Sequence, residues 1–465
     1  MRKILSASIA LALATPFYAS AQTPAVTPSE IQLLRQEIDA LRAAYEARLQ
    51  AMEQRLQLAE RSAAPEVARA DSATATPPAA TVAASSATTG GANRFNPAMS
   101  LILSGGYTRT SRDPANYNIT GIPLPTGSGA GPGTRGFSLA ESELGLSANI
   151  DPWLRGVANI SLHPDDTVSV EEAFVQTTAL SQGLSLKAGR FLSGIGYLNS
   201  QHSHTWDFVD NPLAYQALLG TQFGDDGLQL HWLAPTDQYL ELGVELGRGR
   251  SFPGSDSSRN GAGMTALTAH TGGDLGDSHS WRAGLSMLTT QADAQALTAW
   301  DTTSSIFNGV FSGSTQVWVA DGVWKWAPEG NATRTNFKLQ GEYLRSTRSG
   351  SLGYNYANTS LIAPYQVVQS GWYLQGVYQF MPSWRVGLRT ERLDAGTPDY
   401  GLNPPPIASN GYQPAKHTLM LDYSPSEFSR VRLQLAQDKS REGGADNQFS
   451  LQYQMSLGAH GAHGY

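Results

Sequence analysis

Apolar and polar residues alternate without a break in the last strand-like stretch of the chain, residues 448–457. Alternation with a period of two is the pattern of a pleated strand with one apolar side. The polar face carries no charge, since it consists of glutamine and serine. The apolar face holds Phe449, Leu451, Tyr453, Met455 and Leu457.

The same alternation recurs along the chain from Arg94 onward and predicts an all-β region of sixteen strands. Each predicted strand is about ten residues long, the length that a tilted strand needs to cross the hydrocarbon of a bilayer. The predicted ranges are 98–109, 137–150, 152–163, 168–179, 184–192, 226–235, 238–248, 262–273, 279–290, 315–327, 334–346, 370–380, 384–393, 416–424, 428–438 and 447–457.

The connections between these strands differ in length. Short turns, most with a proline, follow every second strand, at Pro152, Pro235, Pro328, Pro382 and Pro425. Short turns on one rim and long loops on the other are typical of an outer-membrane barrel, and an even strand count places both chain ends on the short-turn, periplasmic rim. A soluble all-β protein is the alternative, but it has no reason to segregate its loops. The predicted long connections are 110–136, 193–225, 249–261, 291–314, 347–369 and 394–415.

Three segments precede the predicted barrel at 94–465. Residues 1–21 combine a basic start, a short apolar run and the end Ala19-Ser20-Ala21, which predicts a secretory signal peptide. A retained membrane anchor is the alternative, although the run is too short to span a bilayer. Residues 62–93 are rich in Ala, Thr, Ser and Pro and predict a flexible linker.

Residues 27–61 predict a helix with a narrow apolar seam. The helix starts with a capping box at Thr27 to Glu30, and Ile31, Leu34 and Ile38 begin a heptad pattern. Because a lone helix cannot bury such a stripe, we expect a self-associating coiled coil in the periplasm; a solvated helix that packs on its own protein is the alternative.

Composition narrows the classes of function. The chain has no cysteine, which excludes disulfide scaffolds and thiolate chemistry. A net charge of −7 and a pI near 5.7 argue against nucleic acid as a partner. The glycine-rich stretch 127–133 has no following Lys-Ser/Thr, and no Gly-x-Ser-x-Gly elbow occurs in a strand-to-helix context. We therefore expect no enzyme activity and no cofactor.

If the apolar faces of the strands contact lipid, the other faces line the lumen. Trp318, Trp372 and Tyr378 then lie outside, as expected for interfacial aromatics. Sixteen strands enclose an aqueous channel, in which inward charges cost little free energy. The predicted pore-lining residues are Glu141, Glu143, Arg155, Lys187, Glu241, Glu245, Arg282, Asp321, Lys325, Lys338, Glu342, Arg385, Arg389, Arg430 and Arg432.

The connection 193–225 is a candidate constriction loop. It is acidic and bears histidines, whereas Arg385, Arg389, Arg430 and Arg432 form a basic ladder on nearby strands. We expect the loop to fold inward and oppose the ladder across a narrow zone with a transverse field; an ordinary surface loop is the alternative. The candidate constriction residues are His202, His204, Trp206, Asp207 and Asp210.

His202 and His204 are also candidate metal ligands. If the stretch is extended, alternate positions place both imidazoles on one face, next to an aspartate, which suits a divalent ion such as zinc. Hydrogen-bonded loop histidines are the alternative interpretation. A second histidine pair, His460 and His463, lies in the C-terminal tail.

Two stretches carry a family resemblance. Residues 170–176 (VEEAFVQ) and 186–191 (LKAGRF) resemble the outer-membrane porin superfamily, nearest to phosphate-selective-porin-like proteins with an N-terminal coiled coil. The resemblance implies a trimeric sixteen-stranded barrel in a Gram-negative outer membrane, through which small hydrophilic solutes or ions diffuse passively.

The QHSHTWDF stretch and the GAHGAH tail are similar to proteins often labelled zinc-regulated TonB-dependent outer membrane receptors. Receptors of that kind have a plug and about 22 strands, more than residues 94–465 can hold. The first alternative function is a receptor or channel for a metal ion or metal complex, with zinc as ligand. The second is a structural protein that tethers the envelope.

Overall fold

The structure is a computed structural model that describes residues 97–458 apart from 257–259, 301–305, 357–358, 403–404, 406 and 408–410. The predicted signal peptide, coiled coil and linker lie outside the described residues, as do the tail histidines His460 and His463. Within the described part of the chain, no helix is long and apolar enough to cross a membrane.

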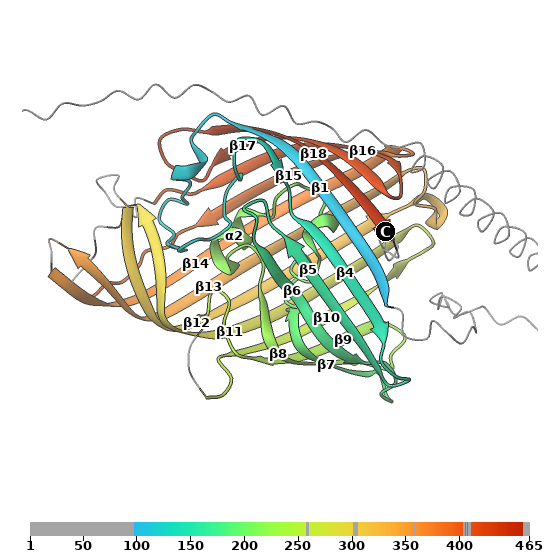
Figure 1. The fold of residues 1–465 in the computed structure, drawn as a ribbon, viewed down its shortest axis with the longest axis horizontal. Helices are drawn as coiled ribbons and strands as arrows, with labels where there is room; N and C mark the ends of the chain where they lie inside the picture. Colours follow the sequence, from blue (N-terminus) through green and yellow to red (C-terminus); the bar gives the residue numbers. More distant parts are fainter. Residues whose placement is uncertain are drawn as a thin grey trace, which may run out of the picture. The chain divides into compact units, whose positions relative to one another are not determined.

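The strands form one closed antiparallel barrel (Figure 1). Consecutive strands pair with each other around the sheet, and β1 closes the ring by pairing with both β18 and β4. β3 and β4 pair with β1 one after the other and together make one barrel strand, while the two-residue β2 lies on a loop and pairs with β11. The barrel therefore has sixteen strands, which confirms the predicted fold class.

The bounds of the strands follow the predicted ranges closely at most ends. The strands are β1 (Ala98–Thr110), β2 (Leu124–Pro125), β3 (Gly136–Leu139), β4 (Ser142–Asn149), β5 (Leu154–Leu162), β6 (Val168–Thr177), β7 (Leu184–Leu192), β8 (Gly224–Leu233), β9 (Tyr239–Gly247), β10 (Met264–Leu275), β11 (His279–Trp300), β12 (Ile306–Trp326), β13 (Asn336–Tyr356), β14 (Thr359–Met381), β15 (Trp384–Asp394), β16 (Ala415–Ser426), β17 (Ser429–Lys439) and β18 (Asp446–Gly458). The helical turns are η1 (Pro114–Asn116), η2 (Ser203–Thr205), α2 (Leu213–Leu219) and η3 (Pro328–Gly330).

Four neighbouring strands, β11 to β14, are 21 to 23 residues long, about twice the predicted length. Residues 291–314 and 347–369 were expected to be loops, and this prediction is wrong, because most of both segments continues the hairpins. Their extensions pack inward-facing aromatic residues against each other, among them Phe311 and Tyr365 with ring centroids 5.7 Å apart. The cluster formed by these aromatic and neighbouring apolar side chains stabilises the parts of β11 to β14 that extend past the other strands of the barrel.

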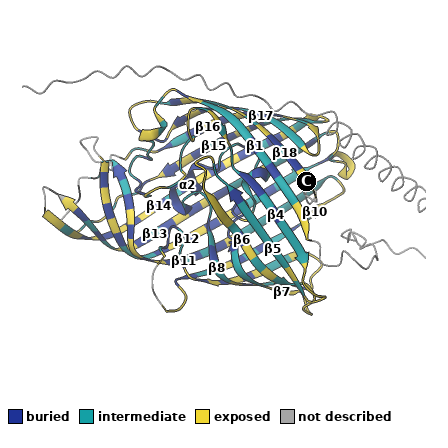
Figure 2. Ribbon diagram, in the orientation of Figure 1, coloured by how far each residue is buried: buried dark blue, intermediate teal, exposed yellow. Residues whose placement is uncertain are grey.

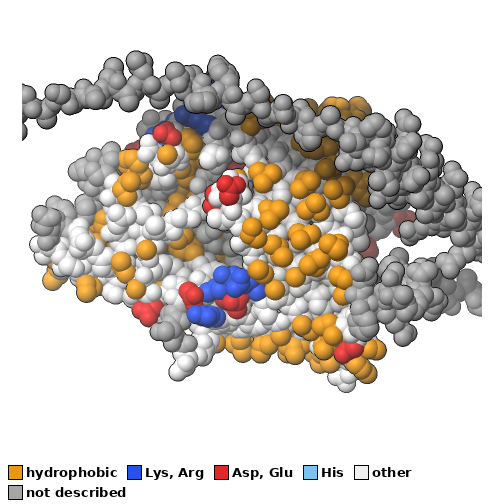
Figure 3. Space-filling view, viewed as in Figure 1, with side chains coloured by type: hydrophobic (Ala, Val, Ile, Leu, Met, Phe, Trp, Pro, Cys, Tyr) orange, Lys and Arg blue, Asp and Glu red, His pale blue; other side chains and the backbone are white. Residues whose placement is uncertain are grey.

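The two faces of the barrel wall have opposite character. Along β13, Leu339 and Tyr343 are exposed, whereas the intervening Gln340 and Glu342 are buried, and Figure 2 shows the same banding on neighbouring strands. Trp318, Trp372 and Tyr378 lie on the outer face, as predicted. Figure 3 shows hydrophobic side chains gathered on the outer surface over the strands at the right of the view.

A segment of the chain folds into the inside of the barrel. Residues 193–223, between β7 and β8, enter the barrel and include α2, all of whose residues are buried (Figure 1). α2 ends at Gly220, which has a left-handed φ of 66° that suits glycine. Leu213, Leu218 and Phe223 pack against inward-facing apolar residues of β10 to β15, such as Val319 and Leu344. The barrel thus has an apolar core of its own, formed around this inward loop.

Candidate functional site

The inward loop (residues 193–223) is held against one wall of the barrel by two aspartates. Asp207 lies between two cationic side chains of the wall: Lys338 Nζ is 2.5 Å from Oδ2, and Arg385 Nη1 is 3.1 Å from Oδ1. Only 5% of the Asp207 side chain is exposed. Charge-assisted hydrogen bonds of this kind, shielded from water, are among the strong polar contacts in proteins.

Asp210 forms a second attachment further along the loop. Arg389 Nη2 donates to its Oδ1 at 2.9 Å, Gln434 Nε2 donates to the same oxygen, and Lys416 pairs with Oδ2. Arg389 also donates to Glu391 Oε1 at 2.7 Å, and Glu391 accepts a hydrogen bond from the backbone N–H of Leu213. This network ties the start of α2 to β15 and β16.

The arginines of β17 hold the loop through its backbone. Arg430 Nη2 donates to the carbonyl oxygen of His204 at 2.7 Å, and Arg432 Nη2 donates to that of Trp206 at 2.6 Å. The Trp206 indole N–H itself donates to the carbonyl of Gln201. The basic ladder and the candidate constriction residues are therefore in direct contact.

This contact differs from the expected arrangement, in which loop and ladder face each other across an aqueous gap. The acidic groups of the loop neutralise the ladder at hydrogen-bond distance, because Asp207 and Asp210 come within reach of Arg385 and Arg389 once the loop packs on the wall. The electric field between these paired charges is therefore confined to contact distances and does not extend across an open lumen. The loop is instead bonded to β13 to β17 at this end and to β4 and β6 through His202 and His204.

The two aspartates have shifted pKa values. Burial alone would raise the pKa of Asp207, but Lys338, Arg385 and Arg432 outweigh it and hold the pKa well below its ordinary value. Burial acts on Asp210 in the same direction and is outweighed by Lys416 and Arg389, so its pKa is also well below the ordinary value. Both carboxylates are therefore ionised at neutral pH and in moderate acid.

A third attachment joins α2 to β13 and β14. The hydroxyl of Tyr215 donates to Glu342 Oε2 at 2.8 Å, and the hydroxyl of Tyr373 donates to Glu342 Oε1 at 2.6 Å. The backbone N–H groups of Tyr197 and Leu198 donate to the same carboxylate. Glu342 is therefore a structural acceptor for the loop, with 3% of the residue exposed, and does not line open lumen.

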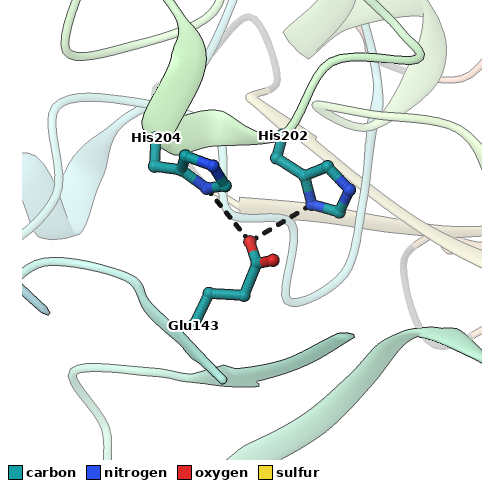
Figure 4. Close-up of side chains that lie close together, drawn as sticks. All are labelled: Glu143, His202 and His204. Atoms are coloured by element: carbon teal, nitrogen blue, oxygen red, sulfur yellow. Dashed lines mark hydrogen bonds and ion pairs between the residues drawn. The ribbon is translucent and has the colours of Figure 1, made fainter. Parts of the chain in front are cut away.

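The opposite end of the loop holds a histidine–glutamate cluster. His202 and His204 both direct Nδ1 at Glu143 Oε2 on β4, at 3.2 Å and 3.1 Å (Figure 4). His202 Nδ1 also lies 3.0 Å from Glu171 Oε2, and its Nε2 lies 3.0 Å from Glu172 Oε2. One donor atom from each of Glu143, His202 and His204 lies within 4.8 Å of the others, close enough to hold a metal ion.

The local structure of the histidines differs from the prediction. His202 caps the helical turn η2 and His204 lies within it, so the two do not occupy alternate positions of a strand, and their rings stack with centroids 5.6 Å apart. The third candidate ligand is Glu143, not an aspartate. Burial alone would lower the pKa of His202, but hydrogen bonds to Glu143, Glu171 and Glu172 outweigh it, so the pKa is well above its ordinary value.

The predicted pore-lining residues divide by burial. Arg155 is exposed near the short-turn rim, where strand β5 begins. The expectation that all of them face water is wrong for Asp321 and for five others that the structure buries: Glu143, Glu245, Glu342, Arg389 and Arg432. The half-buried members are Glu141, Lys187, Glu241, Arg282, Lys325, Lys338, Arg385 and Arg430.

Two residues that complete these networks, Lys416 and Asp422, were not among the predicted site residues. Lys416, Thr418, Met420 and Asp422 follow one another at intervals of two residues and so share one face of β16. All four are buried, which places this face inside the barrel. Asp422 accepts a hydrogen bond from Arg385 at 2.7 Å and so pairs with one arginine of the basic ladder. The signal for these two residues was present in the alternation of the predicted strand 416–424.

Glu171 and Glu172 were not predictable from alternation, because neighbouring residues of a strand normally face opposite sides. A β-bulge places them together: Asn159 pairs with Glu172 and the next residue, Ile160, pairs with Val170, so Glu171 is the extra residue. Both carboxylates therefore reach His202.

A second histidine–glutamate arrangement lies on β8 to β10. Glu241 Oε1 lies 3.4 Å from His231 Nδ1 and 3.6 Å from His270 Nδ1. Arg282, whose guanidinium lies 5.3 Å from the ring centroid of Tyr197, is on the neighbouring β11. His231, Glu241 and His270 all belong to the wall, whereas Tyr197 belongs to the inward loop.

A cavity of about 450 Å³ opens on the long-loop side of the barrel. Its lining is polar and mixed in charge, with Trp300 as the aromatic member. The other lining residues are Arg112, Asp113, Asn116, Asn118, Ile119, Thr120, Gly121, Arg441 and Glu442.

Comparison with known proteins finds similar chains but does not establish a family. No protein-family model matches the chain. An uncharacterized protein of Aquifex aeolicus (strain VF5) is 29% identical over 398 residues, which are 79% of this chain and 80% of that protein.

Similar solved structures are outer-membrane proteins. An anion-selective porin from Comamonas acidovorans has a TM-score of 0.48 at 10% identity and covers 78% of this chain and 99% of its own. OprB of Pseudomonas putida has a TM-score of 0.46 at 14% identity, with 78% of this chain and 94% of its own covered. At these scores and identities, the likenesses establish neither a family nor a function for the chain.

Proposed function

We propose that this chain is an outer-membrane channel of a Gram-negative bacterium, through which small hydrophilic solutes or ions diffuse passively past the inward loop. The observation that carries the proposal is the opposite character of the two faces of a closed barrel: large apolar side chains outside, and charged and amide side chains inside. A polar interior enclosed by an apolar exterior is the arrangement of a membrane-spanning pore.

The outer surface supports a membrane environment. Exposed Leu, Val, Trp and Tyr side chains recur on strands all around the barrel, for example Leu230, Val244, Leu285 and Leu451. Contiguous apolar surface of this extent is unfavourable in water and favourable against lipid. The barrel is closed, so its backbone hydrogen bonds are satisfied within the sheet, as a bilayer requires.

The interior supports a narrow channel of weak charge preference. The wall of β4 to β12 carries the carboxylates Glu143, Glu172, Glu241 and Asp321 against the cations Lys187 and Arg282, and histidines face the first three of these carboxylates. The cations of β13 to β17 are largely paired with acidic groups of the loop and wall. Because those cations are neutralised, we propose weak cation preference instead of the anion preference that an unpaired ladder would give.

Single-channel recording tests this proposal. The refolded full-length protein, inserted into a planar bilayer under a salt gradient, should give stepwise openings and a reversal potential that shows a mild preference for cations. Openings in groups of three would support the homotrimer that the resemblance and the coiled coil predict. A silent bilayer, with insertion verified by protease protection, would contradict the channel.

A further inference from the structure

We propose that Glu143, His202 and His204 form a binding site for a divalent transition-metal ion, best suited to Zn²⁺, at the point where the inward loop meets strand β4. Metal binding at this site does not depend on whether the barrel conducts ions. Its ligands come from two segments, one in the barrel wall and one in the loop, so the ion would fasten the loop to the β4–β6 wall.

The spacing of the donor atoms fits a tetrahedral ion. Zinc bonds to histidine nitrogen and carboxylate oxygen are about 2.0–2.2 Å long, which separates two tetrahedral ligand atoms by roughly 3.3–3.5 Å. Glu143 Oε2 lies 3.2 Å from His202 Nδ1 and 3.1 Å from His204 Nδ1. A shift of a few tenths of an ångström therefore admits the ion.

The histidine backbone is fixed before any ion binds. The carbonyl of His202 accepts hydrogen bonds from the Thr205 N–H at 2.9 Å and the Thr205 hydroxyl at 2.8 Å. The carbonyl of His204 accepts from Arg430 Nη2 at 2.7 Å and Gln454 Nε2 at 3.0 Å. Ligands held by their own hydrogen bonds lose little conformational entropy on binding.

Glu172 supplies the outer partner that metal-binding histidines require. Its Oε2 lies 3.0 Å from His202 Nε2, the nitrogen on the far side of the ring from Glu143. A carboxylate there accepts the Nε2 proton, so that Nδ1 is the nitrogen that binds the ion once the ion displaces its proton. Glu172 is itself held by Asn159 Nδ2 at 3.1 Å and by the Leu192 N–H at 3.0 Å.

Glu171 is a further carboxylate beside the proposed ligands. Its Oε2 lies 3.0 Å from His202 Nδ1, on the same side of the ring as Glu143, and the β-bulge in β6 is the feature that turns it inward beside Glu172. It can bind the ion directly or accept a hydrogen bond from a metal-bound water. Two nitrogens with one or two carboxylates favour Zn²⁺ over Mg²⁺ or Ca²⁺, which prefer oxygen ligands.

Zinc binding to the refolded full-length chain tests the site. The parent protein should carry His460→Ala and His463→Ala, so that the tail histidines do not contribute. Competition with a chromophoric chelator should then give one Zn²⁺ per chain, undisturbed by excess Mg²⁺, and Co²⁺ in its place should show the visible bands of a tetrahedral ion. Glu143→Gln and the pair His202→Ala, His204→Ala should each weaken binding about 100-fold or more, and Glu172→Gln about 10- to 100-fold.

The matched control is the pair His231→Ala, His270→Ala, which removes the second histidine–glutamate arrangement and should leave zinc binding unchanged. Heat-modifiable migration on gels verifies that each variant forms a barrel. The proposal is overturned if the parent binds no zinc, or if one equivalent of zinc persists after His202 and His204 are replaced.

Discussion

Asp207 in the inward loop and Arg385 on β15 form a partly buried ion pair, with 3.1 Å between Oδ1 and Nη1, across 178 residues of sequence. Arg385 also donates to Asp422 at 2.7 Å, so the pair belongs to a network of the barrel wall. The loop therefore reduces the lumen because it is bonded to the wall. Its position depends on a few charges that can be removed one at a time.

Replacing both loop aspartates should weaken the attachment of the loop to β13, β15 and β16. In the variant Asp207→Asn, Asp210→Asn, Lys338 loses its ion pair with Asp207, while Arg385 and Lys416 each lose one of two acidic partners. Breaking one such buried pair costs roughly 3 kcal/mol of stability. We expect a larger and noisier single-channel conductance, and a lower urea midpoint for unfolding of the lipid-bound protein.

The control for this variant is Asp237→Asn, which removes one negative charge from an exposed residue of a short turn. It should leave both conductance and unfolding unchanged. Equal effects of the control and the double variant would show that net charge, and not loop attachment, sets the conductance.

Acid should detach the loop, but only at low pH. The pKa values of Asp207 and Asp210 are lowered in the folded state, so a proton binds the detached form more tightly than the attached one. The stabilisation is complete above the ordinary aspartate pKa of about 3.9 and is lost as the pH falls below it towards the folded values. Conductance should therefore be constant between about pH 8 and pH 5 and rise in stronger acid.

The variant Asp207→Asn, Asp210→Asn supplies the comparison for this pH profile, since it has no aspartates to protonate at the attachment points. Its conductance should lack the acid step. If the step survives in the variant, another group is responsible for it.

The buried carboxylate of Glu342 depends on its two tyrosine donors. Tyr215→Phe removes the hydroxyl that donates to Oε2 at 2.8 Å and leaves the carboxylate short of a hydrogen bond, at a cost of about 1–3 kcal/mol. Denaturant unfolding monitored by tryptophan fluorescence should show the loss. Tyr343→Phe on the outward face of β13, where the tyrosine is 46% exposed, should have almost no effect. Equal losses in the two variants would contradict the role of Glu342 as an anchor.

The extensions of β11 to β14 should unfold separately from the barrel. Phe311 is fully buried in the cluster that joins them, and Phe311→Ala should cost about 3–5 kcal/mol locally. Hydrogen exchange should then accelerate in residues 306–314 and 349–355, while β15 to β18 keep their protection. Faster exchange throughout the barrel would show that the extensions and the barrel form one cooperative unit.

The fold was largely predictable because each strand carries its own evidence. Alternation over residues such as Phe449, Leu451 and Tyr453 needs no knowledge of the neighbouring strands, and the predicted strand 184–192 has the observed bounds. The extensions of β11 to β14 were missed because serines and glycines, as in Ser312-Gly313-Ser314, resemble a loop in composition although they pair in register.

The site was less predictable because its contacts join distant segments. The acidic loop and the basic ladder suggested that the two meet, yet composition could not tell contact from separation across a gap. The convergence of Glu171 and Glu172 on His202 depends on one extra residue in β6, and alternation alone assigns those two carboxylates to opposite faces.

The most direct test of the account is the single-channel conductance of the refolded protein compared with that of the variant Asp207→Asn, Asp210→Asn in the same bilayer. The account predicts discrete openings for the parent and a larger conductance for the variant, because the loop that narrows the lumen is freed. Two silent proteins, with insertion verified in both cases, would contradict the channel; equal conductances would show that the inward loop does not limit the path of ions.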